Sequence, residues 1–99
     1  MQNNDSTIKV WTDLDHNLKF ERELLEIDGK RLSVADGKER ISLDLDEIDK
    51  SYIEEGLGIG KLVIRTRKGK ELEVAYFTKD RAHEFKRLAI ALSEYKDYG

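Results

Sequence analysis

The segment from residue 60 to residue 92 constrains the fold more than any other part of the chain. It reads GKLVIRTRKGKELEVAYFTKDRAHEFKRLAIAL. Apolar and polar residues alternate through residues 61–67 and 71–77, as is typical of half-buried strands. A Gly-centred turn of Lys68, Gly69 and Lys70 separates the two runs. The two runs are therefore predicted to pair as an antiparallel hairpin.

The register of this hairpin follows from the length of its loop. If residues 68–70 form a three-residue loop, Arg67 lies opposite Glu71 and Arg65 lies opposite Glu73. The outer face is then a row of opposite-charge pairs, and the inner face is almost wholly apolar. This register predicts that the arginines are neutralised and that the two loop lysines remain as candidates for contacting an anion.

The segment 79–95 is predicted to form an amphipathic helix. Thr78 is a candidate N-cap, and Asp80 lies in the first turn, where the helix dipole favours an acidic residue. Ile90 lies outside the apolar stripe, either as an ordinary exposed residue or as an anchor for self-association or an inter-domain contact. The stripe that should cover a sheet comprises Ala82, Phe85, Leu88, Ala89, Leu92 and Tyr95.

Before residue 60, two Asp-Gly pairs divide the chain into further strands. Asp-Gly between apolar runs is a hairpin signal, because both central residues of a type I′ turn need positive φ. The pairs at Asp28 and Asp36 therefore predict turns between consecutive strands. Residues 18–27 also show helical spacing, and we take them as a strand that can carry a bulge. The predicted strands of this half are residues 8–12, 18–27, 30–35, 39–43 and 48–54.

A chain of 99 residues makes one domain with one core. We expect disorder at residues 1–6, a single domain over 7–95 and a frayed tail at 96–99. The chain lacks cysteine, and its net charge of −3 gives no general attraction to nucleic acid. It has neither a long apolar run nor a signal-peptide pattern, so we expect a soluble, cytoplasmic protein.

The sequence offers few residues for catalysis. His16 and His83 lie far apart without metal-ligand spacing, and nothing places a histidine beside a strand serine such as Ser33 or Ser42. We therefore expect no enzyme activity, no metal and no cofactor. A small hydrolase would require a closed pocket that holds a carboxylate–histidine pair.

The glycine-rich stretch at residues 56–60 resembles half of a dinucleotide fingerprint. A phosphate-binding loop must open a helix, whereas a strand follows here, so a mobile hairpin loop is predicted instead. Leu57 and Ile59 are apolar at its exposed tip. They either fold back on the core or contact a membrane or a partner.

Several short antiparallel strands followed by one amphipathic helix resemble a pleckstrin-homology-like (PH-like) domain, most closely the bacterial type. The resemblance covers about residues 18–95. It implies an antiparallel β-barrel or sandwich of about six or seven strands, capped by the C-terminal helix. The matching segments are ERELLEIDGKRLSVAD (21–36), DLDEI (44–48), the Gly-rich loop (56–60), the hairpin around Gly69 and FTKDRAHEFKRLA (77–89).

Similar segments occur at the N-terminus of bacterial ABC exporter subunits. The resemblance implies a non-enzymatic module at the inner face of the membrane, in contact with its own downstream transporter domains or with another subunit. The contact surfaces we expect are Ile90, the Leu57 and Ile59 loop, or an exposed strand edge. The alternative is peripheral binding to anionic lipid through Lys68 and Lys70.

Overall fold

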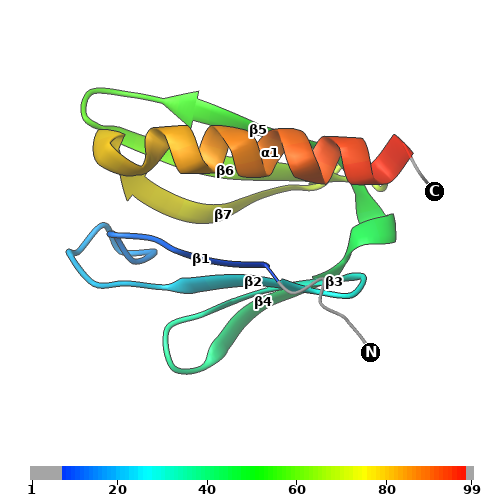
Figure 1. The fold of residues 1–99 in the computed structure, drawn as a ribbon, viewed down its shortest axis with the longest axis horizontal. Helices are drawn as coiled ribbons and strands as arrows, with labels where there is room; N and C mark the ends of the chain where they lie inside the picture. Colours follow the sequence, from blue (N-terminus) through cyan, green and yellow to red (C-terminus); the bar gives the residue numbers. More distant parts are fainter. Residues whose placement is uncertain (1–7, 98–99) are drawn as a thin grey trace.

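The computed structural model describes residues 8–97, and their side chains as far as Ser93. Two antiparallel sheets form a sandwich, with strand orders β1-β2-β3-β4 and β5-β6-β7 (Figure 1). The predicted class, mainly β with one C-terminal helix, is confirmed. The elements are β1 (Ile8–Trp11), β2 (Leu24–Asp28), β3 (Arg31–Ala35), β4 (Glu39–Asp44), the 3₁₀ turn η1 (Leu45–Glu47), β5 (Ile48–Glu55), β6 (Ile59–Thr66), β7 (Glu71–Thr78), the 3₁₀ turn η2 (Lys79–Arg81) and α1 (Ala82–Asp97).

The terminal boundaries differ slightly from those expected. The helix continues to Asp97, beyond its predicted end at residue 95. Residues 96 and 97 of the expected frayed tail (96–99) are therefore helical, while residues 98–99 and the disorder expected at residues 1–6 lie outside the described range.

Apolar residues from both sheets and from α1 form one core. Four of the residues predicted for the helix stripe are buried: Phe85, Leu88, Ala89 and Leu92. The ring of Phe85 stacks on that of Phe77 from β7, with centroids 4.4 Å apart and planes inclined by 7°. The helix is thus anchored on the sheets by aromatic packing as well as by its aliphatic stripe.

On the side between β1 and β5, the helix closes the sandwich. It runs alongside β5 (Figure 1). Towards β1, a shallow groove is lined by Ile8 and Val10 from the strand and by Leu88 and Ala91 from the helix. An amphipathic helix therefore covers the gap between the edge strands of the two sheets.

On the opposite side, between β4 and β7, polar groups close the sandwich. Glu23 is fully buried. Arg40 on β4 donates from Nη2 to Glu23 Oε1 at 2.7 Å and from Nε to Glu23 Oε2 at 3.2 Å. The same Nη2 donates to the carbonyl of Val74 on β7 at 2.8 Å. A two-pronged, charge-assisted contact thus joins the sheets here.

The predicted β6–β7 register is wrong, because the loop lies one residue earlier than predicted and the strand pairing is therefore offset by two residues. Arg65 pairs with Glu71, the partner predicted for Arg67. The amide of Thr66 donates to the carbonyl of Lys70 at 2.8 Å, so the loop is residues 67–69. Gly69 has a φ of 88°. A three-residue hairpin loop ends on a residue in the left-handed region, and that requirement places the glycine last instead of central.

A bulge on β7 shifts the register a second time. Val63 pairs with Glu73 and Leu62 pairs with Ala75, so Val74 is the extra residue on β7. Its side chain is buried, and its carbonyl accepts the hydrogen bond from Arg40. The bulge therefore supplies the acceptor that joins β7 to β4.

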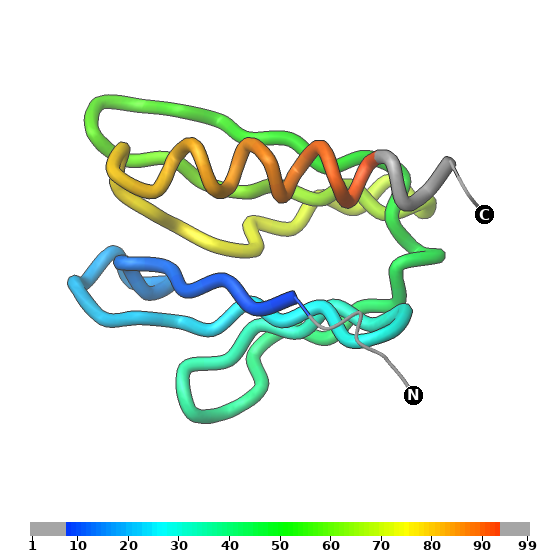
Figure 2. The backbone as a smooth tube through the Cα atoms, viewed as in Figure 1, coloured from blue at the N-terminus to red at the C-terminus, as the bar shows by residue number. Residues whose placement is uncertain are grey.

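The strand predicted for residues 18–27 begins only at Leu24. Asp15 Oδ1 accepts hydrogen bonds from the amides of Asn17 at 2.8 Å and Lys19 at 2.9 Å, which holds the preceding residues in a compact loop. Phe20, placed by the prediction in a strand, is 85% exposed in this loop. Figure 2 shows this loop at the same end of the molecule as the β3–β4 and β5–β6 loops.

Both predicted Asp-Gly turns connect strands, but neither is the expected type I′ turn, because neither Asp28 nor Asp36 has positive φ. Asp28 pairs with Arg31, so the central turn residues are Gly29 and Lys30. Only Gly29 has positive φ, at 63°. This pattern fits a type II′ turn, with glycine first, instead of the type I′ turn expected.

Candidate functional site

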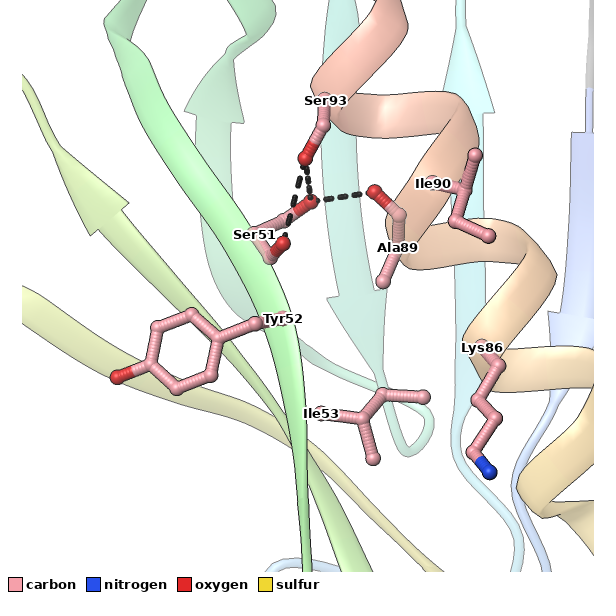
Figure 3. A pocket seen from close by; sticks show the side chains of 7 residues that line it. All are labelled: Ser51, Tyr52, Ile53, Lys86, Ala89, Ile90 and Ser93. Carbon is pink, nitrogen blue, oxygen red and sulfur yellow. Dashed lines mark hydrogen bonds between the residues drawn. The ribbon is translucent and has the colours of Figure 1, made fainter.

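A groove of about 460 Å³ lies between β5 and α1. One wall is the strand segment from Ser51 to Ile53. The other is a stripe of helix residues one turn apart (Figure 3). Among the strands that the structure describes, β5 pairs with β6 alone and is therefore an edge strand. Edge strands keep unpaired backbone groups that can bind a further strand. The helix residues that line the groove are Lys86, Ala89, Ile90 and Ser93.

Hydrogen bonds fix the two walls relative to each other. The hydroxyl of Ser51 is buried and donates to the carbonyl of Ala89 at 2.7 Å. The hydroxyl of Ser93 donates to the carbonyl of Ser51 at 3.2 Å. The two serine side chains point toward each other, while the ring of Tyr52 points away from the helix (Figure 3). The groove is therefore preformed by its own side chains.

The groove combines an apolar surface with one cation. Ile53, Ala89 and Ile90 supply the apolar contacts, and Ile90 remains 59% exposed. Lys86 pairs with Glu55 at 3.2 Å, and both side chains are largely exposed. Such an exposed pair is weak, so a carboxylate of a ligand can replace Glu55. The predicted contact residue Ile90 thus belongs to a formed groove and is not isolated on the surface.

The loop between β5 and β6 is shorter than predicted and comprises residues 56–58. Leu57 is fully exposed, so the alternative in which it folds back on the core is wrong. Ile59 begins β6 and is 41% exposed. Both residues line a second groove, of about 390 Å³, with Leu18 from the β1–β2 loop.

Gly60, predicted to lie in the loop, is part of β6. A Cβ atom at this position would lie 2.5 Å from the ring of Phe77. Its glycine therefore permits a close approach of the aromatic core to the strand, and no phosphate-binding role is needed to explain it.

The outer face of β6 and β7 carries charge pairs other than those predicted. Lys61 contacts Glu73 at 2.6 Å, and this hydrogen bond holds the pKa of Glu73 below its ordinary value and raises the pKa of Lys61. Arg65 contacts Asp49 at 3.2 Å. The pKa of the Tyr52 hydroxyl is raised, mainly by burial and to a smaller extent by the neighbouring Glu71 carboxylate. The one-residue shift of the loop, together with the bulge, redistributes the partners.

Lys68 and Lys70 line a third cleft, between η1 and the β6–β7 turn, with Arg67 at its rim. The predicted pairing of Arg67 with Glu71 is absent. Arg67 instead donates from Nε to the carbonyl of Asp46 at 2.6 Å.

Thr78 does not cap the helix with its side chain. Its hydroxyl and its amide both donate to the carboxylate of Asp13, at 2.5 and 2.9 Å. Asp13 thereby ties the segment after β1 to the end of β7.

A cluster around Glu23 has no counterpart in the sequence prediction. His16 Nδ1 lies 2.8 Å from Glu23 Oε2 and 3.9 Å from Asp36 Oδ2. One ligand atom from each residue falls within 4.8 Å of the others, which is a metal-compatible spacing. However, the guanidinium of Arg40 already binds both oxygens of Glu23, and its charge disfavours a second cation there. The only sequence signal for this cluster was that Glu23 directly precedes the strand residues LLEI.

This cluster contains the carboxylate–histidine pair that an enzyme would need. The imidazole of His16 is 35% exposed, and none of the four grooves described along residues 8–93 is lined by His16 or Glu23. Glu23 accepts hydrogen bonds from Arg40 and from His16, and these contacts hold the β4 side of the sandwich together.

Across residues 8–97, no helix has both the length and the apolar character needed to cross a membrane. Comparisons of the chain with protein-family models, with curated proteins and with solved structures gave no match. Function is therefore inferred from the residues and their geometry.

Proposed function

We propose that this chain is a non-enzymatic interaction module that binds an extended protein segment in the groove between β5 and α1. The observation that carries the proposal is the pairing of an edge strand with a helix stripe that leaves Ile90 exposed. A segment added beside β5 gains hydrogen bonds to edge backbone groups other than the Ser51 carbonyl, which Ser93 already binds, and its alternate side chains reach the helix.

The chemistry of the walls defines the ligand. An apolar side chain fits against Ile53, Ala89 and Ile90, and an acidic residue nearby fits Lys86. Burying one apolar anchor contributes about 1.5–3 kcal/mol, which alone gives very weak binding. Most of the affinity must therefore come from backbone contacts along β5 and from shape, which the serine hydrogen bonds preorganise.

The resemblance to the N-terminal modules of ABC exporter subunits supports a more specific role. In this role the chain is a PH-like module at the cytoplasmic face of a membrane. Its partner is a segment of the downstream transporter domains or of another subunit. The genomic reading frame around this sequence tests it: spanning helices and a Walker motif after Gly99 are expected, and a stop codon there would remove the transporter role while leaving the groove intact.

Selection from a library of random peptides tests the groove directly. We expect the selected peptides to share an apolar residue near an acidic one and to lose binding at least about tenfold with Ile90→Glu. Leu57→Glu is the matched control, since it puts the same charge on an exposed apolar residue outside the groove. Equal binding by the wild type and Ile90→Glu would contradict the proposal.

A further inference from the structure

The cleft between η1 and the β6–β7 turn has an apolar floor and a basic rim. Its volume is about 480 Å³, within the range of small-molecule sites. Leu43 from β4 and Leu72 from β7 form the floor, so the cleft opens between the edge strands of the two sheets. Arg67, Lys68 and Lys70 stand at the rim.

The basic residues of this rim are free of carboxylate partners. Across the described residues, the ammonium groups of Lys68 and Lys70 take part in no ion pair or hydrogen bond, and Arg67 donates to a backbone carbonyl. The cations of β6 differ, since Lys61 contacts Glu73 at 2.6 Å and Arg65 contacts Asp49 at 3.2 Å. The corrected register therefore leaves three cations beside one cleft that form no ion pair among the described residues.

The opposite wall of the cleft is acidic and limits what can bind. Asp46 and Glu47 from η1 both line it. Glu47 Oε1 accepts a hydrogen bond from the amide of Asp44 at 3.0 Å, so it is engaged within η1. With three cations and two carboxylates, the cleft suits a ligand with one small anionic group held on the lysine side.

We propose that this cleft binds an amphiphile with one anionic head group, a carboxylate or a phosphate, and a short apolar chain. The head group contacts Lys68 and Lys70, and the chain covers Leu43 and Leu72. A soluble metabolite and a phospholipid share this chemistry. The site is separate from the peptide groove, because the two share no lining residue and this cleft lies on the β4 and β7 side of the sandwich.

Titration of the ¹⁵N-labelled chain with octyl phosphate, below its micelle concentration, tests the site. We expect saturable shifts of the amides of residues 66–72, with inorganic phosphate binding at least about tenfold more weakly because it lacks the chain. The double variant K68Q/K70Q should weaken octyl phosphate binding about tenfold. K38Q/K79Q, which removes the same charge from exposed lysines outside this cleft, should leave it unchanged.

Co-sedimentation with phosphatidylcholine vesicles, with and without phosphatidylglycerol, distinguishes the two sources. Pelleting that requires phosphatidylglycerol and is lost in K68Q/K70Q assigns the head group to a lipid. Saturable octyl phosphate binding without such pelleting assigns it to a soluble amphiphile. The proposal is overturned if octyl phosphate causes no saturable shift, or if both double variants weaken its binding equally.

Discussion

On the side between β1 and β5, α1 closes the sandwich with apolar side chains, whereas between β4 and β7 the closure is the buried contact of Arg40 with Glu23 and Val74. A helix covers a broad strip and leaves apolar grooves along its flanks. An ion pair holds the sheets at one point and depends on every partner being present. The proposed peptide groove belongs to the first kind of closure, and the proposed anion cleft lies on the side of the second.

Removing one partner of the buried pair should have the largest effect. Arg40→Met leaves Glu23 buried without its cation, which we expect to cost about 3–5 kcal/mol in urea-induced unfolding. Arg31→Met is the control, because Arg31 and Asp44 are both over 60% exposed at 3.8 Å and their pair should contribute less than about 1 kcal/mol. Equal losses for the two variants would show that charge does not close this side.

The helix side should respond less sharply to a packing defect. Gly60→Ala places a Cβ 2.5 Å from the ring of Phe77, which stacks on Phe85. We expect a loss of about 1–3 kcal/mol, since the stacked rings must shift together. Gly56→Ala is matched to it, because there a Cβ lies 3.5 Å from the nearest atom. If the two variants unfold at the same urea concentration, the aromatic stack is not tightly packed against β6.

A smaller and more local effect is expected from the polar contact within the groove. Ser51→Ala removes the hydrogen bond to the carbonyl of Ala89 and should cost about 1 kcal/mol. Amide exchange in α1 near residues 89–93 should accelerate, while exchange in β2 and β3 stays unchanged. Ser42→Ala, at an exposed serine that binds Arg31, should leave exchange in α1 unaltered. Faster exchange throughout the chain in Ser51→Ala would mean that the serine stabilises the whole fold and not the groove.

The smallest expected effect concerns the loop that leads to Glu23. Hydrogen bonds from the amides of Lys19 and Asn17 hold the pKa of Asp15 below its ordinary value of 3.8. A lowered carboxyl pKa adds stability above that value, and the stability is lost as pH falls through the folded pKa. Asp15→Asn keeps an Oδ1 acceptor without the titration, so its thermal midpoint should fall less than that of the wild type below about pH 5. An identical acid profile in both proteins would exclude this contribution.

The sequence predicts how the helix closes one side of the sandwich, but it does not predict the polar contacts of Arg40 that close the other side. The stripe of Phe85, Leu88, Ala89 and Leu92 has the helical period, and the period alone predicts which face is buried. Arg40, by contrast, meets partners 17 and 34 residues away, and one of them is the carbonyl of a bulge. The shifted loop moves the pairing by two residues and keeps each side chain on its face, so the sequence pattern cannot reveal it. The bulge breaks the alternation only at Val74 and Ala75, which are both buried, and two adjacent apolar residues do not by themselves predict a bulge.

The candidate contact residues could be identified from the sequence, but the surroundings that turn them into sites could not. Ile90 was identified as the apolar residue off the stripe, but its groove depends on Ser51 from another element. Lys68 and Lys70 were identified as loop lysines. That Arg67 joins them without a carboxylate partner follows only from the observed turn.

The most direct test of the proposed peptide groove is to map where a selected peptide binds. Titration of the ¹⁵N-labelled chain with such a peptide should shift the amides of residues 51–53 and 86–93 most strongly, and Ile90→Glu should abolish these shifts. Shifts confined to the Leu57 tip or to residues 66–72, with the groove amides unmoved, would contradict it.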